Sequence, residues 1–448
     1  MPSDARDHVF TLYPYHNAIV QSAQGCLVRD TEGREYVDLA AGQLSASLGH
    51  GHPRLLEAAR RQAEKVVHVG SRFLAAATLD GCAAIAGICP RGLDKVVLCS
   101  TGSEANELAI RMARAATGKH ELVGVRQGYY GATHATLSLS DYVGFIRGLG
   151  VRAAGVHRLA CPDCRRCPLG LEERSCDAAC VKRSAAELRA DSTGDIAAFL
   201  VEPVLGSGGI IVPPARFFAA VRQLADGYGA LLIADEAQTG LGRTGRWLGM
   251  EHFGVRPDIC VLSKGLGAGF PVAAVVTSAE IEERCIAAPL ANMSSHSFDP
   301  FAGAIAAEVI RIIRDDGLVE RADAMGRHLR ARLQELVAHH AMLANVRGLG
   351  LMVGLDALSP ESGEPSSLFS LALEAECLLE GVILGYSALS GVLRLLPPLT
   401  IAPAEIDRAI DGLDRAAARV AKSGLDLLRH APTHAGSMKM AATFLTKL

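Results

Sequence analysis

From the end of LGHGHPRLLEAARRQAEKV to about residue 290 the chain alternates short apolar runs with longer stretches whose apolar residues have helical spacing. The short runs are rich in valine, isoleucine and leucine, which is typical of strands buried on both faces of a sheet. They are the segments DKVVLCS, HELVGV, AAFLVEP, ALLIADE, DICVLS and PVAAVVTS. This alternation predicts an α/β fold with a mostly parallel sheet that is covered by helices.

The flanking regions have their own patterns. GCLVRDTEGREYVDLAAG predicts a hairpin with its turn at 31–33, and LGHGHPRLLEAARRQAEKV predicts a helix that begins near Pro53. Towards the C-terminus, one long helical stretch leads to a strand, RGLGLMVGLD, and to the run GVLRLLPPLT. We expect an N-terminal arm and hairpin over residues 1–60, a large domain over 61–305 with an insertion at 161–180, and a smaller α+β domain over 306–448 that the arm joins.

Composition narrows the class of protein. The 448 residues are 49% hydrophobic and 21% charged, which fits a globular enzyme of two or three domains. A net charge of −3 does not favour a nucleic acid or an anionic membrane as partner. The N-terminus lacks the apolar core of a secretory signal, and no apolar run has the ~20 residues that span a membrane. We therefore expect a cytoplasmic protein that acts on small molecules.

Two of the predicted strands end in residues that carry chemistry. ALLIADEAQTG places Asp235 at the carboxyl end of one strand, and DICVLSKGLGAG places Lys264 at the end of another. A carboxylate and an amine at the dry edge of a sheet are costly unless a ligand binds there. Pyridoxal phosphate has a ring nitrogen for the carboxylate and an aldehyde for the amine. Each residue alone also fits a simpler role, a solvated strand-end lysine or an N-cap aspartate.

Three further segments are placed to line the same edge. STGSEAN (100–106) follows a predicted strand and opens a helix, so its backbone N–H groups suit a phosphate, although a capping box explains it equally well. Tyr129, in QGYYG, is placed to stack on a cofactor ring, while a buried core tyrosine is the more common role. Gln238 lies three residues after Asp235, within reach of a phenolic oxygen.

VEPVLGSGGIIVPP, LLIADEAQTGLGRTG and PDICVLSKGLGAGFPVAAVVTS together resemble the class III aminotransferases, which are pyridoxal-phosphate enzymes of fold type I. The resemblance extends over most of the chain and implies a homodimer or a dimer of dimers. It implies that Lys264 binds the cofactor aldehyde, that Asp235 pairs with the ring nitrogen and that Gln238 contacts the phenolic oxygen. The other residues that it places at the cofactor are Thr101, Gly102, Ser103, Tyr129, Glu202 and, from a neighbouring subunit, Ser295.

Within that family, AAGQLSASLGHGHP, SSHSFDP and VLRLLPPLT are most similar to 2,2-dialkylglycine decarboxylase, a decarboxylating aminotransferase. The resemblance implies that Gln43 orients the carboxylate that is lost, and that Arg394 holds a retained carboxylate with Ser207 nearby. Arg72 stands where the decarboxylase has a glycine, and Tyr129-Tyr130 replaces a tryptophan–histidine pair, so we expect a larger or more acidic substrate. The resemblance also implies a sodium or potassium ion held by oxygens of Val69, Ser71, Ser295, Ser297 and Asp299.

Five of the twelve cysteines fall within the insertion, with the spacing Cys-x2-Cys-x2-Cys-x8-Cys-x3-Cys. They are Cys161, Cys164, Cys167, Cys176 and Cys180. Thiolates at this spacing suit a structural zinc ion and, less well, an iron–sulfur cluster. Free or partly disulfide-bonded thiols in a surface loop are an equal alternative.

The sequence thus predicts a pyridoxal-phosphate-dependent aminotransferase that moves an amino group from an amino acid to a 2-oxo acid such as pyruvate. Decarboxylation in the first half-reaction and plain transamination both stay open, because they differ only in which Cα bond stands perpendicular to the ring. The alternatives are a lyase or an aminomutase on the same scaffold, a non-catalytic protein that keeps the fold, and a zinc-dependent function of the cysteine insertion.

Overall fold

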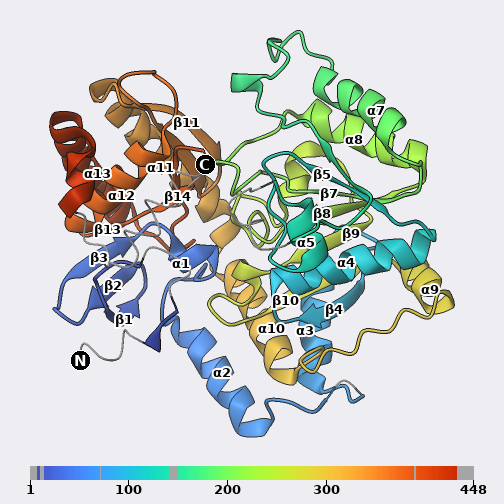
Figure 1. Cartoon of the computed structure of the whole chain (residues 1–448). Coiled ribbons are helices and arrows are strands. Elements are labelled where there is room, and N and C mark those ends of the chain that lie inside the picture. The colour runs from blue at the N-terminus through green and yellow to red at the C-terminus, as the bar shows by residue number, and fades with distance from the viewer. Residues whose placement is uncertain (1–7, 11–14, 71, 142–149, 388–389, 431–448) are drawn as a thin grey trace.

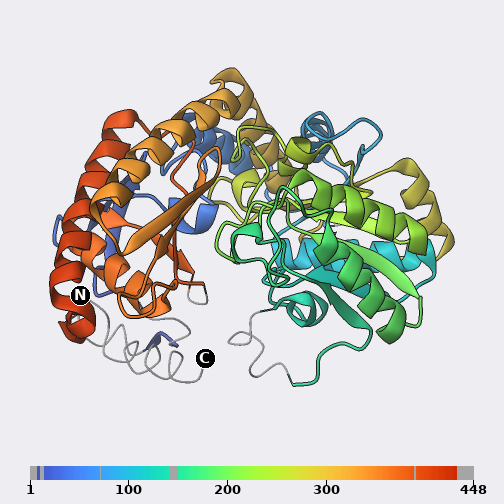
Figure 2. The same cartoon turned by 90° about the horizontal axis from the view of Figure 1, so that it is seen from above.

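The computed structural model describes residues 8–10, 15–70, 72–141, 150–387 and 390–430. The elements fall into two groups, which Figure 1 and Figure 2 show side by side. One group surrounds a large sheet, and the other combines the N-terminal strands with the C-terminal strands and helices. In the described part of the chain, every helix is too short or too polar to cross a membrane.

The large sheet has seven strands in the order β4-β10-β9-β8-β7-β5-β6. Only β10 runs antiparallel to its neighbours, so the prediction of a mostly parallel sheet is confirmed. The sequence pattern missed one strand, β6, whose segment VHRL is short and half polar. The strands are β4 (Lys95–Cys99), β5 (Glu121–Val125), β6 (Val156–Leu159), β7 (Ile196–Val201), β8 (Leu231–Asp235), β9 (Ile259–Leu262) and β10 (Ala273–Thr277).

Helices cover both faces of this sheet, as expected for buried parallel strands. On one face, Leu108 and Ile110 of α4 and Ile281 of α9 join a buried cluster with strand residues. On the other, α7 and α8 pack through residues such as Phe217 and Phe218. The bounds are α4 (Gly102–Thr117), α5 (His134–Leu139), α7 (Ala179–Asp191), α8 (Ala215–Tyr228), α9 (Ala279–Ala287) and the 3-10 turns η2 (Cys164–Arg166), η3 (Gly249–Phe253) and η4 (Lys264–Leu266).

The predicted long helix after residue 299 is two helices, α10 (Pro300–Asp315) and α11 (Leu318–His339). Gly317 separates them with a φ of 58°, a conformation that glycine adopts without steric cost. Helix α10 packs against α2 (Pro53–Lys65) and α3 (Ala76–Ala86). A Cβ atom at Gly81 would lie 2.5 Å from the carbonyl oxygen of Gly303, so the contact between α3 and α10 requires glycine.

Two four-stranded sheets form the rest of the molecule. The first contains the predicted hairpin and a C-terminal strand, β13, that pairs in parallel with β3. In the second, the single strand expected for RGLGLMVGLD is a tight hairpin, because the chain reverses at Gly350 with a φ of 51°. The elements are β1 (Val20–Gln24), β2 (Leu27–Asp30), β3 (Glu35–Asp38), α1 (Ala41–Leu44), β11 (Leu343–Leu349), β12 (Met352–Ala357), α12 (Ser367–Leu379), β13 (Val382–Ile383), β14 (Gly385–Ser387), β15 (Val392–Leu395), α13 (Pro403–Ser423) and η5 (Gly424–His430).

Candidate active site

Five of the predicted site positions follow strands that point in the same direction. Strands β5, β7, β8 and β9 are mutually parallel, and β4 shares their direction because β10 is antiparallel to both β4 and β9. Thr101, Tyr129, Glu202, Asp235 and Lys264 therefore lie along one edge of the sheet. Ligands of an open α/β sheet usually bind at the edge formed by the carboxyl ends of its parallel strands.

Lys264 opens the turn η4 directly after β9 and is held in a strained conformation with a φ of 44°. Such strain in a non-glycine residue is typical of functional positions. Among the described residues its amine makes no hydrogen bond and no ion pair. Burial lowers the pKa of the amine, the carboxylates of Asp235 and Glu202 raise it, and the charge of Arg394 lowers it further. Lys264 is thus an uncommitted amine whose pKa lies below its usual value.

Asp235 ends β8 and is only 5% exposed. Its two oxygens are held separately, because the Asn106 side chain donates to Oδ2 at 2.7 Å and the Ala237 N–H donates to Oδ1 at 2.9 Å. Burial raises the pKa of this carboxyl, while the charge of Lys264 and the two hydrogen bonds lower it. Within the described chain Asp235 and Lys264 attract each other without direct contact, which leaves room for a group between them.

Glu202 joins two loops at the same edge. Its Oε1 accepts the N–H of Tyr129 at 2.9 Å, and its Oε2 accepts the N–H of Gly206 at 3.1 Å. Burial and the nearby charge of Asp235 raise the pKa of this carboxyl to about 8, while the two N–H donors and the charge of Lys264 act to lower it. Glu202 therefore positions the loop of Tyr129 and the loop of Ser207.

The two adjacent tyrosines have different environments. Tyr130 is buried, and its hydroxyl accepts the N–H of Val125 at 2.9 Å, so the simpler core role belongs to it. Tyr129 is half-buried, and its backbone is fixed by Glu202. Of the pair, Tyr129 has the exposure that a residue covering a ligand requires.

The sequence left two roles open for the segment 100–104, a helix cap and a phosphate-binding site, and the structure allows both. Thr101 caps α4 by accepting the N–H of Glu104 at 3.2 Å, and Glu104 accepts the N–H of Ser100 at 2.9 Å. In the described chain the N–H groups of Gly102 and Ser103 have no acceptor, as expected in the first turn of a helix. A Cβ atom at Gly102 would lie 3.3 Å from the Ser263 side chain, so the helix starts close to the turn of Lys264. Capping and phosphate binding use different atoms here and are compatible.

Gln238 and Ser207 meet at the same edge, where the Gln238 amide donates to the Ser207 hydroxyl at 3.4 Å. A Cβ atom at Gly206 would lie 2.2 Å from Gln238 Oε1, so a larger residue there would displace the Gln238 side chain from its present position. That Oε1 atom is buried and has no hydrogen-bond partner among the described residues. An unpaired buried polar atom beside Asp235 and Lys264 fits a site whose ligand completes it.

Gln43 and Arg394 reach this edge from the smaller sheets. Gln43 lies exposed in α1, which contacts η4, and the nearby Ser47 hydroxyl donates to the carbonyl of Gly265 at 3.1 Å. Arg394 lies on β15, and its charge acts on the Lys264 amine. Arg72 and Ser295 are exposed, and within the described chain neither side chain makes a hydrogen bond or an ion pair.

The structure does not support the metal sites that the sequence predicted. The five insertion cysteines are free thiols, and in the described chain no three of them bring their sulfur atoms within 4.8 Å of one another. For the alkali-metal site, the two carboxylate oxygens of Asp299 lie 2.5 and 2.6 Å from nitrogens of His68 and His296, so this position is not lined by oxygen alone. The roles of the Ser295 side chain and of the Val69 and Ser297 carbonyls stay predictions, and Ser71 lies outside the described residues.

Two residues of this site escaped the sequence analysis. Asn106 orients Asp235 and also donates to the carbonyl of Tyr130 at 2.8 Å; its only signal is an amide on the buried face of α4. Arg347 on β11 donates to the carbonyl of Gly209 at 2.6 and 3.0 Å and pairs with Asp356 at 2.6 Å. It thereby holds the loop that carries Ser207. Its only signal is a cation within an apolar strand.

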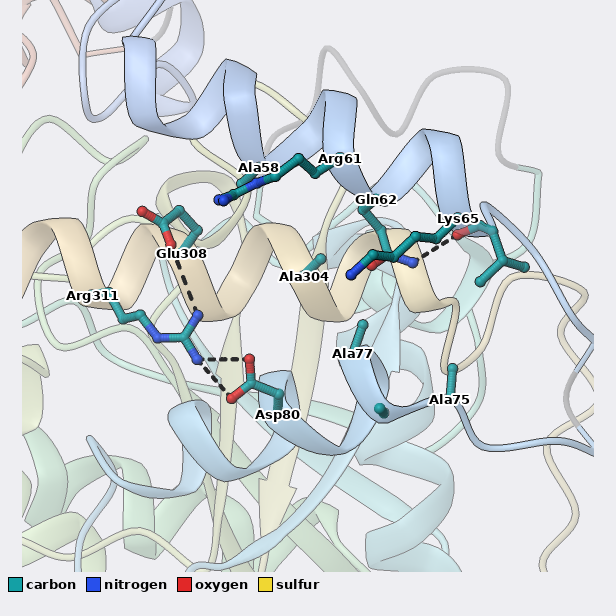
Figure 3. Close-up of a pocket in the computed structure, with 12 residues that line it drawn as sticks. Ala58, Arg61, Gln62, Lys65, Ala75, Ala77, Asp80, Ala304, Glu308 and Arg311 are labelled. Carbon is teal, nitrogen blue, oxygen red and sulfur yellow. Dashed lines mark hydrogen bonds and ion pairs between the residues drawn. The ribbon is translucent and has the colours of Figure 1, made fainter.

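A separate pocket of about 480 Å³ lies between α2, α3 and α10. Figure 3 shows that Arg311 pairs with two other charged residues of its lining: it binds both oxygens of Asp80, at 2.6 and 2.7 Å, and lies beside Glu308. None of the predicted site residues lines this pocket. The sheet edge with Lys264, and not this pocket, is the candidate active site.

Comparisons with known proteins show the family to which the chain belongs. The model of the family "Aminotransferase class-III" matches residues 12–417. An uncharacterized aminotransferase of Schizosaccharomyces pombe is 37% identical over 409 residues, covering 90% of this chain and 91% of that protein. The leucine/methionine racemase of Thermococcus litoralis is 35% identical over 411 residues, covering 91% and 92%. The solved omega transaminase of Pseudomonas jessenii in complex with PMP superposes with a TM-score of 0.86 at 28% identity, covering 94% and 99%.

The chain belongs to the class III aminotransferases, which have the fold of type I pyridoxal-phosphate enzymes. The family implies pyridoxal phosphate as cofactor and an amino compound and an oxo acid as substrates. The unpaired Gln238 oxygen, the free N–H groups of α4 and the separated Asp235–Lys264 pair fit that cofactor.

Proposed function

We propose that this chain transfers the amino group of an amino acid to a 2-oxo acid such as pyruvate at the edge that carries Lys264. The observation that supports this most is the pair Asp235 and Lys264. Their charges attract each other, but within the described chain no hydrogen bond or ion pair joins them, which leaves room for a cofactor between them. Bound pyridoxal phosphate supplies an electron sink for the bond that breaks at the substrate Cα.

Each residue has a separate task in this proposal. Asp235, fixed by Asn106 and Ala237, holds a proton on the ring nitrogen, and the N–H groups of Gly102 and Ser103 bind the phosphate. The free Lys264 amine would take the proton from the substrate Cα and return it, and its lowered pKa suits it to act as a base near neutral pH.

The residues around the ring orient it and exclude water. Gln238 contacts the phenolic oxygen and Tyr129 covers the ring face, while Glu202 acts as a positioning residue through the backbones of Tyr129 and Gly206. On the substrate side, Arg394 binds a carboxylate with Ser207 nearby, and the charge of Arg72 would favour a larger or more acidic substrate.

Decarboxylation depends on Gln43 in this proposal. If Gln43 binds the substrate carboxylate perpendicular to the ring, that carboxylate leaves as carbon dioxide; if the proton stands there, Lys264 removes it and plain transamination follows. The structure leaves the Gln43 side chain exposed beside the Lys264 turn. We take transamination as the main reaction, and the experiment below tests the decarboxylating one.

We also propose a homodimer or a dimer of dimers. An exposed apolar group supports it, in which Phe73 is 69%, Leu74 63% and Met293 94% exposed. These residues flank Arg72 and Ser295 in the sequence. A second copy that covered them would bring Ser295 towards the phosphate of the neighbouring subunit.

The division into an arm (1–60), a large domain (61–305) and a small domain (306–448) stays our proposal, as does the cytoplasmic location. The sheet content supports the division, because the large sheet lies wholly between β4 and β10. The pairing of β13 with β3 supports a small domain that includes the arm.

A racemase is the second candidate, and the Thermococcus litoralis relative favours it. Racemisation uses the same removal of the Cα proton but returns the proton to the opposite face, so no oxo acid is needed. It differs from transamination in leaving the cofactor in its aldehyde form after each turnover.

The test is the absorption of the cofactor-loaded protein mixed with an amino acid in the absence of an acceptor. An ordinary L-amino acid should convert the pyridoxal form to the pyridoxamine form, and pyruvate should reverse the change. 2-Aminoisobutyrate has no α-proton, so conversion by it would show decarboxylation and a role of Gln43, while no change would leave plain transamination. Appearance of the D-amino acid without cofactor conversion would replace the proposal by racemisation.

A further inference from the structure

Two histidines and an aspartate meet at the start of α10, outside the edge that carries Lys264. The Nδ1 atom of His68 lies 2.5 Å from Oδ1 of Asp299, and the Nδ1 atom of His296 lies 2.6 Å from Oδ2. In the described part of the chain, this is the one group of three metal-ligating residues whose ligand atoms all lie within 4.8 Å of one another.

Asp299 does not cap the helix that it precedes, although its position predicts that it would. It is the N-cap residue of α10, where an aspartate usually accepts an N–H of the first turn, yet its side chain makes no capping bond. The preceding residue, Phe298, has a φ of 63°, and its carbonyl accepts the hydroxyl of Thr78 at 2.8 Å. A strained backbone thus holds the carboxylate towards the histidines, with the side chain only 12% exposed.

The histidines come from different parts of the chain, His68 from the segment between α2 and α3 and His296 from the segment before α10. Their rings lie 5.2 Å apart between centroids and are tilted by 56°. Two imidazoles and one carboxylate are a common ligand set for zinc and related transition metals, whereas sodium and potassium prefer oxygen alone. The nitrogens therefore change the class of ion that this position suits.

We propose that His68, His296 and Asp299 bind one divalent transition-metal ion, zinc in the first instance, with water completing the coordination. Ligand bonds of about 2.0–2.1 Å place neighbouring ligand atoms roughly 3 Å apart, so the present nitrogen–oxygen contacts would widen by less than about 1 Å. Each Nδ1 atom gives up its proton on binding, because the neutral imidazole can carry that proton on Nε2 instead. The ion thus replaces the two protons that now join the histidines to Asp299.

The ion would fix the segment that carries Ser295. Ser294, two residues before His296, donates to Oε1 of Glu104 at 2.7 Å, and Glu104 belongs to the first turn of α4. A metal bridge between His296 and Asp299 would therefore hold this segment against the helix whose N–H groups face the phosphate. This consequence for the cofactor rests on the proposed function, whereas metal binding itself does not.

Zinc binding to the full-length, cofactor-loaded protein tests the proposal. Metal content is measured after chelation and dialysis against zinc, and affinity by competition with a chromophoric chelator. The variant His68→Ala/His296→Ala should lose one equivalent of zinc per chain. The exposed His296→Gln change alone, which the fold tolerates more easily, should weaken that site at least about 100-fold, because losing a group that merely orients a ligand already costs 10–100-fold.

His328→Ala is the matched control. His328 also pairs with an aspartate, since its Nε2 lies 2.9 Å from Oδ1 of Asp407, but in the described chain it belongs to no group of three ligands. Its zinc content should equal that of the wild type. X-ray absorption separates this site from the thiols of the insertion, because nitrogen and oxygen ligands lie at about 2.0–2.1 Å from zinc and sulfur at about 2.3 Å.

The proposal expects a nitrogen and oxygen shell in the wild type that disappears in the double variant. It is overturned if the wild type binds no zinc, if the double variant binds as much zinc with the same affinity, or if the shell contains sulfur alone. If the wild type binds zinc as expected and the double variant does not, but the wild type has no transaminase activity, the proposed function fails and the metal site stands.

Discussion

Two regions of the molecule, the sheet edge with Asp235 and the segments around His68 and Asp299, differ in how far their side chains are buried and hydrogen-bonded by the chain itself. At the edge, the buried carboxylates accept hydrogen bonds from the chain itself. Asp235 accepts from Asn106 and Ala237, and Glu202 accepts from Tyr129 and Gly206. The other region is exposed, with apolar side chains in solvent and a carboxylate held by two exposed histidines.

The difference teaches where a binding partner is needed. A buried site prearranged by its own chain needs only the small molecule that fills it, because its polar groups are already oriented. An exposed region with large apolar side chains, and with a carboxylate that binds two histidines and does not cap its helix, is where we propose a second chain and an ion. The predictions below test each half of this contrast.

Loss of the Lys264 amine should have the largest effect. Lys264→Ala removes the general base, so turnover should fall by about 10³-fold or more, while the unfolding temperature stays near that of the wild type because the amine makes no hydrogen bond within the described chain. Steady-state kinetics with an amino acid and pyruvate measure this. Lys95→Ala, which removes a strand-end lysine paired with Glu282 at the surface, should keep its activity; equal losses in both variants would contradict the site.

The second largest effect should come from placing charged residues in the exposed apolar group, because they would weaken self-association. Phe73→Asp/Leu74→Asp should weaken self-association by roughly 100-fold or more, since burying each side chain contributes about 1.5–3 kcal/mol. Sedimentation velocity over a concentration series measures the effect. Ile286→Asp, at a position 70% exposed on α9, is the control and should leave association unchanged. A wild-type protein that stays monomeric at high concentration would contradict the proposed dimer.

Removing the group that orients Asp235 tests whether the chain itself prearranges this edge. Asn106→Ala leaves Oδ2 of a buried carboxylate without its donor, so the free energy of unfolding should fall by about 1–3 kcal/mol. Urea denaturation measures it. If stability and cofactor affinity both stay unchanged, Asn106 does not position Asp235.

The smallest expected effect is a change in pH dependence. The folded-state pKa of Glu202 is raised to about 8 from 4.5, so its contribution to stability is fully present below about pH 4.5 and is lost as pH rises through 8. In the cofactor-free protein, Glu202→Gln imitates the protonated acid and should reduce the fall in stability between pH 5 and 8. Glu187→Gln, an exposed partner of Arg183, should keep the wild-type slope. Parallel slopes for all three proteins would contradict the assigned pKa.

Most of the large sheet and the edge of the candidate site could be predicted, because apolar runs such as ALLIAD end in polar residues at the same edge of a parallel sheet. The pattern failed where local composition hides the geometry. Strand β6 is half polar, and the reversal at Gly350 splits an apolar run that resembles one strand. Asn106, Arg347 and the pairing of His68 with Asp299 depend on contacts between distant segments, which no local pattern records.

The most direct test of the site is the position of the covalent bond to the cofactor. The protein loaded with pyridoxal phosphate is reduced with borohydride and digested, and the labelled peptide is identified by mass spectrometry. The account predicts a single label on Lys264, absent from Lys264→Ala and present in Lys95→Ala. A label on another lysine, or no label on a protein that has taken up the cofactor, would contradict it.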